Sequence, residues 1–191
     1  MLTARLPVRL LLRQALLCLL LLAVTLPAPS FAQDQAPRPK MTITLETGKI
    51  VIELRPDKAP KTVARIRELA NSGFYDKLTV IRVAKGHVVQ MGDPLFNGEG
   101  GSGQLIPAEF NDLKHLRGAV GMARDEDPNS ADSQFYICTA DRPHLDGQYT
   151  VFGQVLSGME LLDAMKPGDG PMGFILEHGM QPKILSVRVE G

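Results

Sequence analysis

The chain has 191 residues, 44% of them hydrophobic, and its 21 basic and 21 acidic residues give a formal charge of zero. This balance does not predict the basic surface that nucleic-acid binding needs, so no nucleic-acid partner is expected. About 150 residues remain once the N-terminal segment is set aside, which is enough for one domain with a substantial core.

Residues 1–32 have the pattern of a cleaved signal peptide. Three arginines precede an apolar run from Ala15 to Leu26, and Ser30-Phe31-Ala32 places small residues at the positions that a signal peptidase inspects. The run is shorter than the roughly 20 residues that cross a bilayer. The alternatives are an uncleaved anchor, which the polar residues that follow disfavour, and a lipoprotein site at Cys18, which the large Leu17 disfavours. We therefore predict a periplasmic protein without membrane attachment after cleavage.

Cleavage there removes three arginines and no acids, leaving 18 basic against 21 acidic residues and a formal charge of −3. One cysteine, Cys138, would remain, so no intramolecular disulfide could form. Its strand-like neighbours indicate that it is buried. The proline-rich, charged segment 33–40 is interpreted as a disordered tether, and the folded domain is predicted to span residues 41–190.

The domain is predicted to begin with a β-hairpin and a helix. Residues 41–46 and 50–54 are rich in β-branched side chains and flank Thr47-Gly48, which is typical of a hairpin. Residues 61–71 then carry apolar side chains at helical spacing, with a proline near the start and a glycine just past the end.

Six more short apolar runs, bounded by Gly, Pro, Asp or Asn, predict further strands: 79–83, 87–91, 119–123, 134–138, 150–155 and 184–189. Residues 158–165 predict a second short helix. Eight strands with few helices indicate a barrel or a sandwich, and this pattern alone does not choose between them.

Several weaker motifs lack the context that their chemistry requires. Residues 98–103 match the glycine pattern of dinucleotide-binding loops, but prolines on both sides exclude the necessary strand and helix, so we interpret them as a flexible loop. Residues 125–136 lack the glycine and glutamate of a calcium loop. Ser133, His144 and Asp146 lack a nucleophile elbow, and the four histidines lack zinc spacing. We therefore predict no cofactor and no metal.

Four linked motifs carry the functional signal. They are Ile81-Arg82-Val83, Gln90-Met91-Gly92-Asp93, residues 132–140 (DSQFYICTA) and Leu145-Asp146-Gly147 with Val151-Phe152-Gly153. Their order and spacing resemble those of cyclophilin-type peptidyl-prolyl cis-trans isomerases over residues 41–190. Met122-Ala123-Arg124 is similar to a segment of the bacterial members.

This resemblance implies a closed eight-stranded antiparallel β-barrel capped by two α-helices. It also implies an enzyme that accelerates rotation of X-Pro bonds, here in proline-containing segments of exported proteins. Amide resonance sets a rotation barrier of about 18–20 kcal/mol, but no bond is made or cut. Such an enzyme therefore needs no nucleophile, metal or cofactor, only a pocket that fits the twisted amide better than the planar forms.

The resemblance assigns Arg82 as the donor to the prolyl nitrogen and Gln90 as the residue that holds Arg82 or the substrate carbonyl. Tyr136 occupies a position where the family commonly has phenylalanine, so its hydroxyl predicts a shallower or wetter pocket. His144 occupies the position of a tryptophan in cyclosporin-sensitive members. The implied substrate-binding residues are His87, Val88, Ala123, Arg124, Gln134, Tyr136, His144, Leu145 and Tyr149.

The alternative is a chaperone or binding module of the same fold that grips proline segments without accelerating their rotation. Retention of Arg82 and Gln90 favours the enzyme. No exposed apolar stripe or heptad stands out in the sequence, so we predict a monomer.

Overall fold

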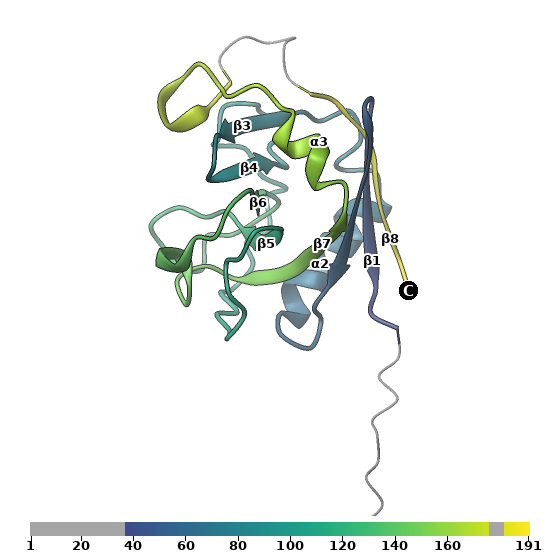
Figure 1. Cartoon of the computed structure of the whole chain (residues 1–191). Helices are drawn as coiled ribbons and strands as arrows, with labels where there is room; N and C mark the ends of the chain where they lie inside the picture. The colour runs from purple at the N-terminus through teal and green to yellow at the C-terminus, as the bar shows by residue number, and fades with distance from the viewer. Residues whose placement is uncertain (1–36, 176–181) are drawn as a thin grey trace, which may run out of the picture. The chain divides into compact units, whose positions relative to one another are not determined.

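The computed structural model describes residues 37–175 and 182–191 (Figure 1). The predicted signal peptide, 1–32, and the first part of the predicted tether, 33–36, lie outside the described residues. Within the described part, no helix is long and apolar enough to cross a membrane. The same part contains eight strands and two α-helices.

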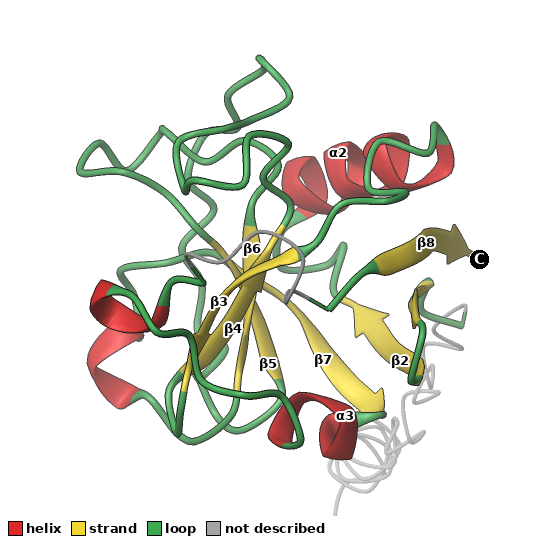
Figure 2. Cartoon of the chain, turned by 90° about the horizontal axis from the view of Figure 1, so that it is seen from above, coloured by secondary structure: helices red, strands yellow, loops and turns green. Residues whose placement is uncertain are grey.

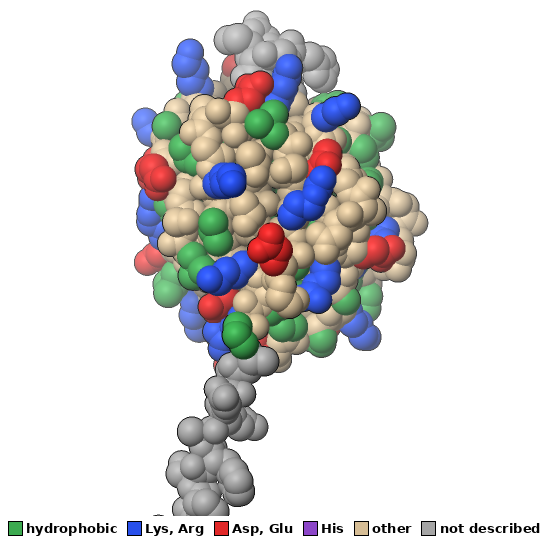
Figure 3. All heavy atoms as spheres, turned by 90° about the vertical axis from the view of Figure 1, so that its right-hand side faces the viewer, with side chains coloured by type: hydrophobic (Ala, Val, Ile, Leu, Met, Phe, Trp, Pro, Cys, Tyr) green, Lys and Arg blue, Asp and Glu red, His purple; other side chains and the backbone are tan. Residues whose placement is uncertain are grey.

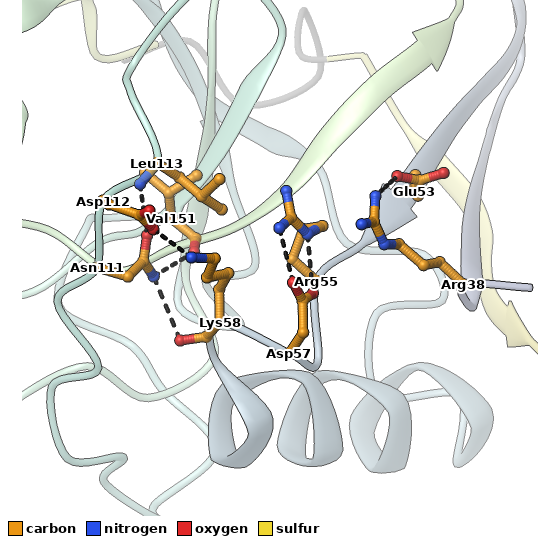
Figure 4. Close-up of polar contacts among 9 residues, drawn as sticks. All are labelled: Arg38, Glu53, Arg55, Asp57, Lys58, Asn111, Asp112, Leu113 and Val151. Atoms are coloured by element: carbon orange, nitrogen blue, oxygen red, sulfur yellow. Dashed lines mark hydrogen bonds and ion pairs between the residues drawn. The ribbon is translucent and has the colours of Figure 1, made fainter. Parts of the chain in front are cut away.

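The domain starts with the predicted hairpin, β1 (Lys40–Leu45) and β2 (Gly48–Leu54), whose residues alternate between buried and more exposed positions. The chain before it is tied to the same hairpin. Arg38 pairs with Glu53 at 2.8 Å (Figure 4), and the Leu54 amide donates to the Pro39 carbonyl at 2.8 Å. The last residues of the predicted tether, 38–40, therefore contact the domain.

Helix α2 (Pro60–Asn71) forms where predicted and buries the face that contains Val63, Ile66 and Leu69. Its preceding residue offers no side-chain cap. Instead, the Glu109 carboxylate, 47 and 48 residues away, accepts from the amides of Thr62 at 2.8 Å and Lys61 at 3.0 Å. A carboxylate there satisfies unpaired N–H groups and complements the positive end of the helix dipole.

The loop that contains Glu109 makes two further contacts with the rest of the domain (Figure 4). Asn111 Nδ2 donates to the Val151 carbonyl at 2.9 Å, and Lys58 Nζ lies 2.6 Å from Asp112 Oδ1. Because the loop joins the start of α2 to strand β7, its position is set by elements that are distant in sequence. It leads directly into His115.

The six remaining strands form within two residues of their predicted bounds: β3 (Val80–Ala84), β4 (Val88–Met91), β5 (Ala119–Met122), β6 (Phe135–Cys138), β7 (Val151–Ser157) and β8 (Ile184–Glu190). Together with β1 and β2 they make one antiparallel sheet in the order β3-β4-β6-β5-β7-β2-β1-β8. The second helix, α3 (Met159–Asp163), is shorter than predicted. The two helices lie at opposite ends of the sheet (Figures 1 and 2).

The prediction of a closed barrel is wrong, because the sheet is an open half-barrel (Figure 2). The edge strands β3 and β8 share no ladder among the described residues, and the bridge between Thr79 and Lys183 lies just before each of them. Farther along β3, the Ile81 carbonyl accepts from the Ile175 amide at 2.9 Å. Arg82 also bridges Phe174, so this part of the β3 edge pairs with the segment before residue 176 and not with β8.

The central strands β4, β5 and β6 are buried on both faces. Side chains on one face, including Val89, Phe135 and Ile137, join the main core. Alternate side chains on the other face, including Tyr136 and Cys138, form a smaller apolar cluster. Cys138 is buried as predicted, and burial raises the pKa of its thiol to about 12, which keeps it unreactive.

Candidate active site

The strand register places three of the predicted site residues in one cross-strand row. Arg82 on β3 is opposite Gln90 on β4, Gln90 is opposite Tyr136 on β6, and Tyr136 is opposite Gly121 on β5. Residues directly opposite in antiparallel strands point to the same face. The row therefore lies on the face with the smaller apolar cluster, away from the main core.

A line of hydrogen bonds connects this row to the glycine-rich loop. Arg82 Nη1 donates to Gln90 Oε1 at 3.3 Å, and Gln90 Nε2 donates to Gln134 Oε1 at 2.9 Å. Gln134 Nε2 in turn donates to the carbonyls of Gly98 at 2.9 Å and Gly100 at 2.8 Å. Each amide is thereby oriented, and the Gln90 oxygen is turned toward the guanidinium.

Arg82 has a second anchor in the loop at 171–174. Its Nε donates to the Met172 carbonyl at 2.8 Å, and its guanidinium lies 5.6 Å from the centre of the Phe174 ring. Among the described residues, Nη2 makes no hydrogen bond. Burial lowers the pKa of Arg82, although a guanidinium stays charged at neutral pH. The result is a fixed cation whose Nη2 has no partner in the described part of the chain.

A cavity of about 320 Å³ opens beside Arg82, and nine of the eleven predicted site residues line it. Gln134 lines an adjoining cavity together with residues of the glycine-rich loop, and it contacts Gln90 there. His144 stacks on His87, with ring centroids 5.9 Å apart. The nine residues are Arg82, His87, Val88, Gln90, Ala123, Arg124, Tyr136, Leu145 and Tyr149.

The structure adds four lining residues that the motifs did not identify: Gly98, Asp125, Met172 and Phe174. Gly98 accommodates the Phe174 ring, because a Cβ there would lie 3.0 Å from it. A larger apolar cavity of about 480 Å³, lined by Leu161, Met165 and Ile175 among others, shares no residue with the site. The chemistry therefore belongs to the smaller cavity, where the fixed cation lies.

The Tyr136 hydroxyl has a protein partner. It lies 2.9 Å from Nε2 of His115, a residue that is 1% exposed and that no motif singled out. The hydroxyl therefore does not depend on water for its hydrogen bond, which removes the reason for expecting a wetter pocket. The Tyr136 ring remains in the cavity lining.

The polar rim of the cavity carries several charges. Burial, followed by the nearby positive charge of Arg82, lowers the pKa of His87. Arg124 lies 4.6 Å over the Tyr149 ring and donates to the carbonyls of Asp125 and Gln148. These contacts fix Arg124 at the edge of the cavity rather than leaving it as a mobile surface cation.

A fixed guanidinium beside a small pocket, on an antiparallel half-barrel, is suited to gripping and distorting a short peptide segment without covalent chemistry. Comparison with known proteins identifies the family. Residues 40–187 match the family model described as cyclophilin type peptidyl-prolyl cis-trans isomerase/CLD. The chain therefore belongs to the cyclophilin-type peptidyl-prolyl cis-trans isomerases, as the motifs predicted.

Relatives and solved structures agree. A probable peptidyl-prolyl cis-trans isomerase of Brucella suis is 41% identical over 168 residues, covering 82% of this chain and 86% of that protein. Peptidyl-prolyl cis-trans isomerase B of Bacillus subtilis is 47% identical, covering 65% and 89%. The crystal structure of a Cryptosporidium parvum cyclophilin type isomerase matches with a TM-score of 0.72 at 26% identity, covering 80% and 97%. The bacterial relatives support the predicted bacterial branch.

Proposed function

We propose that this isomerase acts on X-Pro bonds of exported proteins and that Arg82 stabilises the twisted amide. The observation that carries the assignment is the clamp on Arg82, which Met172, Gln90 and Phe174 form around one side of the guanidinium. When the X-Pro bond rotates, the prolyl nitrogen becomes pyramidal and regains a lone pair. The free Nη2 can donate to that lone pair at the moment it appears.

A hydrogen bond from Arg82 cannot account for the whole rate acceleration. A charge-assisted hydrogen bond contributes roughly 1.5–3 kcal/mol, whereas a rate gain of about 10⁵ requires roughly 7 kcal/mol. The remainder is assigned to the cavity, where Tyr136, Leu145 and Val88 provide walls against which a proline ring can pack. Exclusion of water there strengthens the donor's interaction, and the clamp avoids reorganisation during rotation.

A similar protein has a crystal structure that was determined with a proline dipeptide present. A second structure of the Cryptosporidium parvum isomerase, determined in the presence of the dipeptide Ala-Pro, matches this chain with a TM-score of 0.71 at 28% identity. We place the proline ring against Tyr136 and the X-Pro bond beside Arg82. Gln90 then orients Arg82, and Gln134 orients Gln90.

A protease-coupled isomerase assay tests the assignment. The wild type should accelerate cis-to-trans conversion of an Ala-Pro peptide, and Arg82→Lys should lose at least tenfold in kcat/KM, because one ammonium cannot reproduce the forked contacts of a guanidinium. Arg188→Lys, at an exposed ion pair on β8, is the control and should behave as wild type. A wild type that binds the peptide without accelerating its conversion would favour the chaperone instead.

Export is proposed from the signal-like pattern of residues 1–32. The mature protein should begin at or near Gln33 and be found in the periplasm, where it would catalyse folding of other exported chains. N-terminal sequencing of protein from the cell envelope tests this. An intact Met1 on protein recovered from the cytosol would contradict it.

We propose that the protein is a monomer, on the basis of the side chains on its surface. The side of the domain that carries β1 and β8 shows basic and acidic side chains interspersed, with only scattered apolar ones (Figure 3). Association surfaces usually present a larger continuous apolar patch. Light scattering after size-exclusion chromatography should give the mass of one chain at every concentration, and a concentration-dependent dimer would contradict the proposal.

A further inference from the structure

His115 is the most buried histidine of the described residues and has no role in the mechanism above. It lies just before β5, at the end of the loop fastened by Asn111. The Asp146 carboxylate accepts from it twice, from its backbone amide at 2.8 Å and from ring Nδ1 at 3.0 Å. A buried histidine whose backbone amide and ring are both held by one carboxylate has a fixed position and orientation.

These contacts determine which ring nitrogen carries the proton. The hydrogen bonds from the backbone and ring of His115 lower the pKa of Asp146, so its carboxylate is ionised and only accepts. Burial lowers the pKa of His115, although Asp146 opposes this, so the ring is neutral with its proton on Nδ1. Nε2 is then an acceptor, and the Tyr136 hydroxyl donates to it over 2.9 Å.

The Tyr136 ring is also held by its neighbours. A Cβ on Gly121, directly across the strand pair, would lie 2.6 Å from both Cζ and the hydroxyl oxygen of Tyr136, so only glycine leaves room for the ring. The Tyr149 ring packs edge-on against two rings, with its centroid 6.0 Å from that of Tyr136 and 6.5 Å from that of His115. The ring is therefore confined along its face, at its edge and at its hydroxyl.

We propose that His115 is a positioning residue of the isomerase site, which acts through the chain Asp146, His115 and Tyr136. The chain holds the Tyr136 ring as one wall of the cavity and keeps its hydroxyl turned away from the substrate. This inference rests on the isomerase function of the cavity. It goes beyond that function because it makes the identities of residues 115 and 136 interdependent.

The test is a double-mutant cycle on the full chain, with kcat, KM and the dissociation constant of an Ala-Pro peptide as readouts. His115→Leu leaves the hydroxyl without its acceptor, and the ring must shift to find another. We expect kcat/KM to fall at least tenfold, chiefly through KM, because Arg82 is unaffected. In the Y136F background, which has no hydroxyl to satisfy, the same substitution should change kcat/KM less than threefold. Leu116→Ala, at the exposed neighbouring residue, is the control.

Equal losses in the two backgrounds would overturn the proposal. If neither the single variant His115→Leu nor the double variant folds, the proposal also fails, because His115 would then be needed by the domain and not by the site. If only the double variant folds, the result supports the coupling. Nitrogen NMR shifts of the wild-type imidazole give an independent check, and a proton on Nε2 would contradict the chain. Wild-type turnover separately tests the isomerase function on which the inference rests.

Discussion

The two faces of strands β3 to β6 differ in how their side chains are held. The core face consists of apolar residues such as Val89, Phe135 and Ile137, which need only neighbours of suitable volume. The site face contains Arg82, Gln90 and Tyr136, each of which depends on a specific partner atom. We infer that one face determines stability and the other activity, so substitutions on the two faces should separate the two properties.

The largest expected effect is on the core face. Phe135 is fully buried and packs edge-on against Phe152 at 6.1 Å. Phe135→Ala should lower the free energy of unfolding by about 3–5 kcal/mol, because it removes transfer free energy and leaves a cavity. Chemical denaturation measures this. Leu185→Ala, at a half-exposed apolar residue of β8, is the control and should change stability by less than about 0.5 kcal/mol.

Inhibition by cyclosporin should be weak, because His144 occupies the tryptophan position of sensitive family members. Losing about 60 Å² of apolar contact removes roughly 1.5 kcal/mol, and losing the indole donor removes about 1 kcal/mol more. Together they weaken binding by about two decades. The stacking of His144 on His87 also engages the imidazole face. Titration of the purified domain tests this, and nanomolar inhibition would contradict it.

A substitution at Gly121, on the site face, should lower both the stability of the domain and its activity. Gly121→Ala places a methyl group 2.6 Å from the Tyr136 ring, which must move into the cavity. Overpacking of this kind costs about 1–3 kcal/mol, and we expect a loss of kcat/KM of about tenfold. Kinetics and denaturation measured together would show both effects. An unchanged kcat/KM would indicate that the position of the Tyr136 ring does not matter.

The smallest expected effects come from His87 at the rim. Its pKa is lowered by burial and Arg82, so it is neutral at pH 7 and becomes protonated only below the ordinary histidine value of about 6.5. Protonation adds a hydrated cation to the cavity wall. Activity should therefore be flat from pH 8 to about 6.5 and fall below that. The free energy of unfolding should also fall as the pH drops below about 6.5, because the unfolded chain binds this proton at higher pH than the native state.

His87→Phe should remove this acidic fall and raise kcat/KM about threefold at pH 7, since about 30 Å² of added apolar contact is worth roughly 0.75 kcal/mol. The comparison of pH profiles needs the variant, because His115 also titrates below its ordinary value. An acidic fall that persists in His87→Phe would assign it to another titratable group, such as His115. A loss of activity without any pH dependence would make His87 a structural residue.

The sequence predicts the core face better than the site face. Runs of apolar and β-branched residues bounded by turn residues locate all eight strands to within two residues, because buried strands are rich in such side chains. The motifs also predict the residues that gather around Arg82. The open sheet was not predictable, since it depends on backbone contacts between β3 and residues near 175. His115 and Met172 were missed because their partners lie 21 and 90 residues away and no periodicity marks such pairs.

If Arg82 serves the reaction and not the fold, then isomerase kinetics and thermal unfolding should respond differently to Arg82→Ala. The side chain is half-buried on the site face and outside the main core. We expect kcat/KM to fall at least tenfold while the melting temperature stays within about 2 °C of wild type, because the main core is unchanged. Equal activity of the two forms, or a loss of activity that merely follows unfolding, would contradict it.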